Sequence, residues 1–230
     1  MIRLRAAEDR GKYQGGGLTS YHSFSFGEYY DEDFMGFRSL RVINDDIIEG
    51  GVGFPPHPHR DMEIVTYVTE GTLEHQDSMG NKEALRPGEI QRMTAGKGVT
   101  HSEYNKSKEE TLRLLQIWIV PEQRGLPPGY EQRSIGAPAE GFKKLAARSD
   151  PDSIVHIHQD ATLYEGTFKQ GATAELPLPK SRYGYLHVVS GGVKVGDLTA
   201  KPGDAFMIAN EERPQLASLA DSKVLFFDLA

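Results

Sequence analysis

The chain has 230 residues, enough for one large domain or two small domains with their own cores. Its formal net charge of -7 argues against direct binding of nucleic acid, because phosphate backbones need a basic surface. There is no cysteine, which excludes disulfides, zinc knuckles, iron–sulfur clusters and thiol catalysis. No signal-like segment and no apolar run of about 18 residues is present, so we expect a soluble, cytoplasmic protein without membrane association.

Short strand-like segments recur along the chain. They cover residues 39–43, 63–68, 89–93, 112–120, 155–157, 186–189, 205–208 and 224–227. Turn sequences such as Arg86-Pro87-Gly88 and Lys201-Pro202-Gly203 separate them. Regularly spaced short strands with Gly and Pro turns are typical of a sandwich or barrel. We therefore expect an all-β chain, with at most a turn or two of helix around residues 138–148.

An internal repeat is visible in the turns. Residues 67–71 and 85–89 resemble residues 186–191 and 200–204, with an offset of 120 between Gly71 and Gly191 and of 115 between Gly88 and Gly203. This similarity predicts two related β-modules, joined near the Gly- and Pro-rich segment 124–129.

Two short clusters point to a metal site: His57-Pro58-His59 and His101-Ser102-Glu103. Residues i and i+2 of a strand face the same side, so pairing of these two stretches would bring three imidazoles and a carboxylate together. Such N/O donors suit Fe, Mn, Co, Ni, Cu or Zn. Glu63 shares the parity of residues 57 and 59, so either Glu63 or Glu103 could supply the carboxylate.

The repeat predicts that only one module carries this site. With the offsets above, the counterparts of His57 and His59 are Pro177 and Pro179, and those of His101 and Glu103 are Leu216 and Ser218. None of these four residues binds a metal well. The remaining histidines have simpler interpretations: His22 as a packing or supporting group, His75 in a hairpin, His156 and His158 on a half-exposed strand, and His187 as structural.

The spacing of the candidate ligands resembles the two motifs of the cupin superfamily. More specifically, most of residues 1–125 resembles the pirin family, through the motifs His22-Ser23-Phe24-Ser25-Phe26, Phe34-Met35-Gly36-Phe37, Leu40-Arg41-Val42-Ile43-Asn44-Asp45-Asp46, His57-Pro58-His59-Arg60-Asp61-Met62-Glu63 and Thr94-Ala95-Gly96-Lys97-Gly98-Val99-Thr100-His101-Ser102-Glu103. The second half is only loosely similar.

The resemblance implies a bicupin: two double-stranded β-helix (jelly-roll-like) barrels packed together. Residues 1–130 would form the metal-binding N-terminal barrel, and residues 131–230 a degenerate C-terminal barrel without metal ligands. The pirin pattern assigns one divalent metal to His57, His59, His101 and Glu103. Iron(II) is the expected ion, with Ni, Co, Mn, Cu or Zn as alternatives. Glu63 would then be a neighbour that is hydrogen-bonded to a ligand imidazole.

Bacterial members of the family include proteins with quercetin 2,3-dioxygenase activity. The resemblance therefore implies a dioxygenase that opens the heterocyclic ring of a flavonol such as quercetin and releases carbon monoxide, with Glu103 as the catalytic base. The expected partners are a phenolic small molecule and dioxygen, and we expect a monomer. The alternative is a pirin-like regulator that acts through protein partners, with the metal as a structural or redox switch.

Overall fold

The computed structural model describes residues 1–230 and consists almost entirely of β-strands. Its helices are two single 3-10 turns, η1 (Ala7–Asp9) and η2 (Glu32–Phe34), and neither could span a membrane. Each strand segment expected from the sequence overlaps a strand, which confirms the all-β prediction. The helical turn expected around residues 138–148 is wrong: Gly141–Ala147 is strand β13, because its backbone pairs along β15 (Ala161–Phe168).

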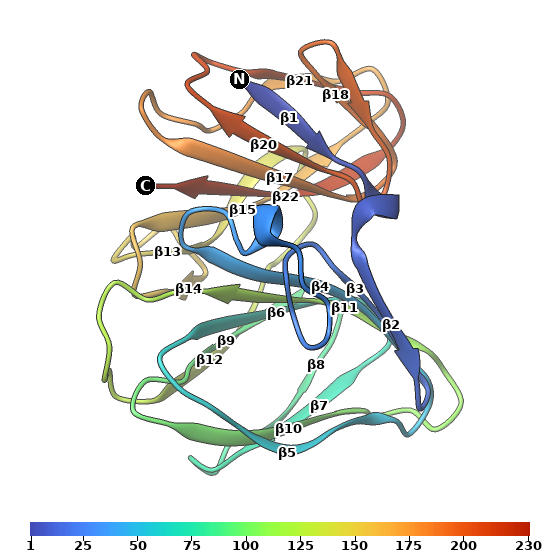
Figure 1. Ribbon diagram of the computed structural model, residues 1–230, viewed down its shortest axis with the longest axis vertical. Coiled ribbons are helices and arrows are strands. Elements are labelled where there is room, and N and C mark those ends of the chain that lie inside the picture. The colour runs from blue at the N-terminus through green and yellow to red at the C-terminus, as the bar shows by residue number, and fades with distance from the viewer.

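The first barrel consists of a seven-stranded sheet and a four-stranded sheet (Figure 1). In spatial order the large sheet contains β12 (Gly129–Ser134), β9 (Glu89–Thr94), β6 (Glu63–Glu70), β11 (Leu112–Ile119), β4 (Leu40–Ile48), β3 (Leu18–His22) and β2 (Gly11–Gly15). The small sheet contains β5 (Gly53–His59), β10 (Val99–Asn105), β7 (Leu73–Asp77) and β8 (Lys82–Leu85).

The second barrel has the same construction. Its seven-stranded sheet contains β1 (Ile2–Arg5), β20 (Ala205–Ala209), β17 (Tyr183–Ser190), β22 (Ser222–Leu229), β15, β13 and β14 (Val155–His156). Its four-stranded sheet contains β16 (Thr173–Glu175), β21 (Gln215–Ser218), β18 (Val193–Val195) and β19 (Leu198–Ala200). The predicted duplication of the β-module is therefore present in the fold.

The turns of the repeat have the same backbone geometry in both barrels. Gly71 and Gly191 have φ angles of 79° and 78°, and Gly88 and Gly203 have φ angles of 86° and 85°. These left-handed values favour glycine, which explains why the repeat is most visible at these positions. The sequence similarity is thus strongest where the backbone tolerates little else.

The N-terminal strand belongs to the second barrel, and a later strand takes the equivalent position in the first barrel. Strand β1 pairs with β20 at one edge of the second barrel, and β12 occupies the equivalent edge of the first barrel, beside β9. In Figure 1 the dark blue β1 accordingly lies among the red strands. Since strands cross the predicted division at residue 130, we keep that division as a proposal.

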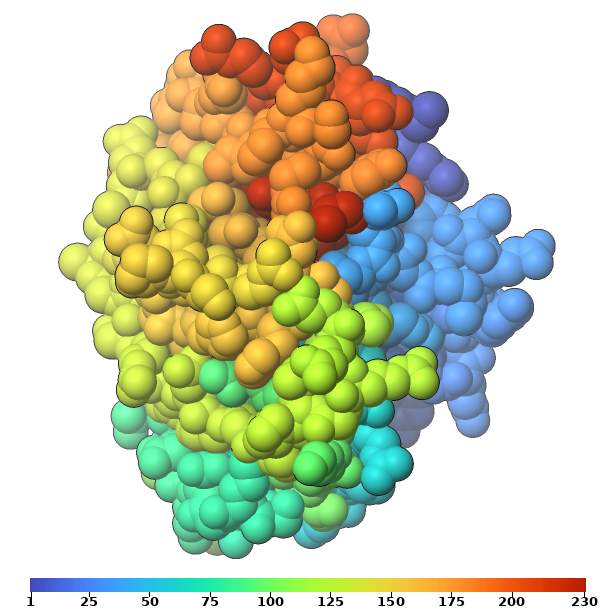
Figure 2. Space-filling view, turned by 90° about the vertical axis from the view of Figure 1, so that its left-hand side faces the viewer, coloured from blue at the N-terminus to red at the C-terminus, as the bar shows by residue number.

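The largest hydrophobic core lies between the two barrels. Most of its 22 buried residues come from the two large sheets, such as Val65 and Ile117 from the first and Tyr185 and Leu225 from the second. Figure 2 shows the green and yellow segments of the chain lying over this junction. The outward faces of the large sheets are thus buried against each other, which leaves the interior of each barrel for a separate purpose.

Gly53, at the start of β5, lies where two backbones of the first barrel approach each other closely. A Cβ atom at this position would lie 2.2 Å from the carbonyl oxygen of Glu103. We expect Gly53→Ala to lower the free energy of unfolding by about 1–3 kcal/mol, because the strand that carries His101 must shift. Thermal and urea unfolding measure this loss. Gly192→Ala is the matched control, since its Cβ would meet nothing closer than 3.5 Å; equal losses in both variants would contradict the expectation.

Candidate metal centre

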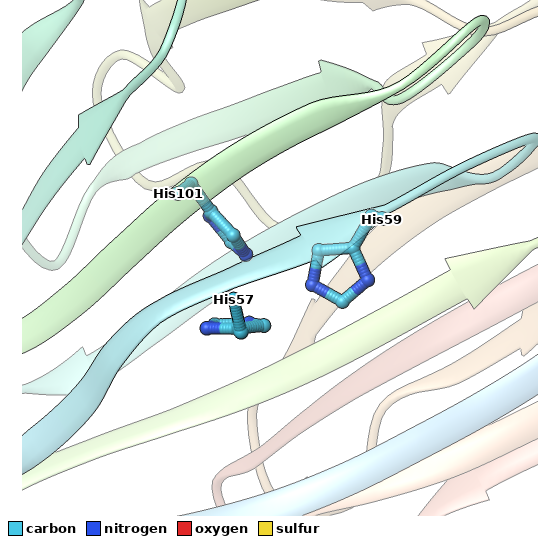
Figure 3. Close-up of side chains that lie close together, drawn as sticks. All are labelled: His57, His59 and His101. Atoms are coloured by element: carbon cyan, nitrogen blue, oxygen red, sulfur yellow. The ribbon is translucent and has the colours of Figure 1, made fainter.

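The antiparallel pairing of β5 with β10 brings three histidines together. His101 lies opposite His57, and Val99 lies opposite His59. The ring centroids of the three imidazoles are 4.5–4.8 Å apart, and their nearest ligand atoms all lie within 4.8 Å of one another (Figure 3). The structure therefore assembles the histidine cluster that strand parity predicted.

Two of these imidazoles have a ring nitrogen that is free to bind a metal. The Nδ1–H of His57 donates to the carbonyl oxygen of Pro55 at 2.8 Å, which leaves Nε2 with a free lone pair. His101 is buried, and its Nε2 has no hydrogen-bond partner. A buried nitrogen without a partner is costly unless it binds something else, so this atom fits a metal ligand.

The cluster holds His59 and His101 in the neutral form that metals require. Burial, together with the neighbouring His57, lowers the pKa of His59 to about 4. Burial, together with His57, His59 and His75, lowers the pKa of His101 to about 2. Both imidazoles are therefore uncharged at neutral pH.

Glu103 lies beside this cluster and belongs to an adjoining group. Its carboxylate, His101 and His75 have ligand atoms within 4.8 Å of one another. One carboxylate oxygen, Oε2, accepts a hydrogen bond of 2.9 Å from Nε2 of Gln116, while Oε1 is buried without a partner. Burial raises the pKa of Glu103 to about 7, even though the Gln116 bond lowers it. Glu103 thus offers one fixed and one free oxygen.

Glu63 does not join the histidines, although the parity of the sequence allowed it. Asp61 has a φ of 50°, and this left-handed residue turns the chain out of β5 before β6 begins at Glu63 in the other sheet. The Glu63 carboxylate accepts hydrogen bonds from the hydroxyl of Thr94 and from Nδ1 of His158. The expected hydrogen bond from Glu63 to a ligand imidazole is therefore wrong, because its imidazole partner comes from the second half of the chain.

A row of polar side chains crosses the large sheet behind the histidine cluster. The strand registers align His22, Asn44, Gln116, Thr66 and Gln91, one residue on each of five neighbouring strands. His22 contacts Asn44 at 2.8 Å, Thr66 donates to Gln116 at 3.0 Å, and Gln116 donates to Glu103. Among these five residues, the sequence indicated a supporting role only for His22. The only signal was a polar residue at an inward position of each strand.

The equivalent row in the second barrel is apolar or aromatic. The corresponding registers align Tyr164, Phe226, Leu186 and Phe206. These registers also correct the expected counterparts of the ligands. Leu216 lies opposite Val195 as Glu103 lies opposite His75, so Leu216 replaces Glu103 and not His101. Both groups of potential metal ligands lie in the first barrel.

A cavity of about 630 Å³ opens onto the cluster. Its lining includes His57, His59 and Glu103, together with the aromatic side chains of Phe26, Phe54 and Trp118. Asp46, a second buried carboxyl, also lines it, and burial raises the pKa of Asp46 to about 7. His22, expected to be a packing or supporting group, also lines the cavity. A cavity of this size and character suits a planar aromatic molecule.

Two duplicated β-barrels, with a histidine cluster in the mouth of one of them, define a bicupin. Comparison with known proteins gives the family: residues 4–119 match pirin, and residues 145–229 match the quercetinase C-terminal cupin domain. The chain belongs to the pirin family.

Relatives cover the whole chain. A protein of Escherichia coli K12 named quercetin 2,3-dioxygenase is 47% identical over 229 residues, covering 100% of this chain and 99% of its own. A pirin-like protein of Caulobacter vibrioides is 39% identical over 100% of both chains. The crystal structure of the bacterial pirin YhhW of E. coli in complex with nickel(II) superposes with a TM-score of 0.96 and 46% identity, covering 100% of this chain and 99% of the other.

The raised pKa of Glu103 predicts a proton release on metal binding. Near pH 7 we expect a fraction of a proton to leave Glu103 if a divalent ion binds its carboxylate, because this group is partly protonated there. The release grows below pH 7 and disappears above about pH 8, so affinity rises with pH through this window. His59 and His101 add nothing, since they are already neutral.

Calorimetry of Ni²⁺ binding in buffers of different ionisation enthalpy measures this release. In Glu103→Gln the release should fall, because the amide has no ionisable proton. A release that is unchanged in that variant would show that the proton comes from another group.

Proposed function

We propose that this protein is a metal-dependent dioxygenase that opens the heterocyclic ring of flavonols such as quercetin and releases carbon monoxide. The observation that carries the proposal is the cluster of His57, His59 and His101 beside the free Oε1 of Glu103, at the base of an aromatic-lined cavity. The names of the E. coli relatives support the enzyme class. The chain would act in solution on a small phenolic molecule and dioxygen, without a nucleic-acid partner.

The ligands that we propose for one metal ion are His57, His59, His101 and Glu103. Three imidazoles and one carboxylate fit a divalent transition metal. The nickel(II) complex of the related bacterial pirin supports a bound metal of this kind. Iron(II) is the ion that we propose, while Ni, Co, Mn, Cu and Zn accept the same ligands. When bound, such an ion supplies a Lewis acid with open coordination positions, the requirement for reactions with dioxygen.

Glu103 is the catalytic residue in this proposal. Its Oε1 has no hydrogen-bond partner and can accept the proton of a substrate hydroxyl, while Gln116 holds Oε2 in place. Burial favours the protonated form of this carboxyl group, so Glu103 would take up that proton once its oxygen no longer binds the metal. Loss of this proton makes a flavonol electron-rich and so more reactive toward an oxidant.

The cavity walls contribute binding and orientation. Phe26, Phe54 and Trp118 offer apolar faces to an aromatic ring system, and Trp118 also packs edge-on against His59 with ring centroids 4.9 Å apart. Asp46 and Asn44 line the same space and can contact hydroxyl groups. The size of this cavity favours an enzyme over the regulatory alternative, in which a closed metal site would serve as a structural or redox switch.

Metal content, oxygen uptake and carbon monoxide release with quercetin test this function. We expect the metal-loaded wild-type protein to release carbon monoxide, and Glu103→Ala to reduce turnover by about 100-fold or more, the usual effect of losing a general base. His57→Ala and His101→Ala should each lose most of the bound metal.

His156→Ala is the matched control, because His156 is a half-buried histidine on β14 in the second barrel. It should keep both metal and activity. Full activity of Glu103→Ala would remove Glu103 from the mechanism. Wild-type metal content in both ligand variants would refute the assigned site.

A further inference from the structure

Asp77, at the end of β7, is a buried carboxylate behind the histidine cluster. One oxygen of Asp77 accepts hydrogen bonds from the backbone N–H groups of Met79 and Asn81, and the other accepts from the Asn81 amide at 2.8 Å and from Nε2 of His75 at 3.0 Å. Burial alone would raise the pKa of Asp77, but the bonds from His75 and Asn81 outweigh it and lower the pKa. Asp77 is therefore ionised and can only accept hydrogen bonds.

The ionised Asp77 determines which nitrogen of His75 carries the hydrogen. Because Asp77 only accepts, Nε2 of His75 must donate, and Nδ1 of His75 keeps its lone pair. His75 is fully buried, and its ring stacks on Tyr130 with centroids 5.0 Å apart. The orientation of this imidazole is thus restrained on both its edge and its face.

The lone pair of His75 faces His101. The two Nδ1 atoms are 3.4 Å apart, at the long end of hydrogen-bonding distance, and the amide nitrogen of Gln91 lies 3.5 Å from the same atom of His75. The register of β10 with β7 places His101 and Glu103 opposite Asp77 and His75. Two lone pairs would repel at this distance, so Nδ1 of His101 must carry the hydrogen and donate it. The other nitrogen of His101, the buried Nε2 without a partner, then has its lone pair free.

We propose that His75, held by Asp77, is a positioning residue that sets the tautomer of His101 and directs its Nε2 lone pair to the metal. This inference rests on the proposed metal site. Through the hydrogen bonds between Asp77 and His75 and between His75 and His101, Asp77 and His75 would strengthen metal binding by His101 without contacting substrate. Partners of this kind are worth about 10–100-fold in metal affinity.

The structure allows one competing use of the same residues. His75, His101 and Glu103 have ligand atoms within 4.8 Å of one another, so they could bind a second ion directly. In that case His75 would be a ligand, and the protein would bind two ions per chain. The stoichiometry of metal binding separates the two roles.

Two amide variants of His75 isolate the contact with His101. His75→Asn places an amide oxygen at the level of Nδ1, so it retains an acceptor for His101. His75→Gln places its amide at the level of Nε2, near Asp77, and removes that acceptor. His187→Gln is the control, because His187 is equally buried but lies on β17 of the second barrel.

Isothermal titration with Ni²⁺ and the visible spectrum of the Co²⁺ form provide the test. We expect one ion per chain in the wild type, a dissociation constant raised about 10–100-fold in His75→Gln, and a value within about threefold of wild type in His75→Asn and His187→Gln. The Co²⁺ spectrum should change in His75→Gln only.

Equal affinity of His75→Gln and the wild type would overturn the inference. Equal weakening of His75→Asn and His75→Gln would also overturn it, because the acceptor would then not matter. Two ions in the wild type and one in either variant would make His75 a ligand instead. A wild-type protein that binds no Ni²⁺ at all would refute the proposed metal site itself.

Discussion

The site depends on one pairing, that of β5 with β10 in the small sheet of the first barrel. This pairing sets His57 opposite His101 and keeps His59 on the same side, so two local i, i+2 patterns become one cluster. A shift of one residue in either strand would turn its ligands to the other face. The close approach of Gly53 to the Glu103 carbonyl and the irregularity between His101 and Glu103 both help to specify the register.

The two barrels share a topology but differ in what fills them. In the second barrel, 13 buried apolar side chains pack the interior. In the first barrel the apolar clusters contain six and four residues, and a polar row and a cavity occupy the remaining space. The second barrel is therefore well suited to a supporting role: its apolar filling stabilises its own large sheet, and the 22-residue core packs that sheet against the large sheet that carries the polar row.

The sequence predicted the features that depend on local pattern. Alternation within His57–His59 and His101–Glu103, and turn glycines such as Gly71 and Gly191, are visible over a few residues. Features that depend on distant contacts were not visible. The left-handed turn at Asp61 separated Glu63 from the ligands, and His158 reached Glu63 from 95 residues away. The role of Gln116 appears only when five strands are aligned.

In the proposed site, paired strands of the first barrel build one metal centre from three imidazoles and a carboxylate. X-ray absorption at the metal edge of the Ni²⁺-loaded protein measures this coordination directly. We expect a shell of nitrogen and oxygen atoms, with the multiple scattering of three imidazoles and about 2.0–2.2 Å between metal and ligand atoms. A shell with one imidazole or none would contradict it.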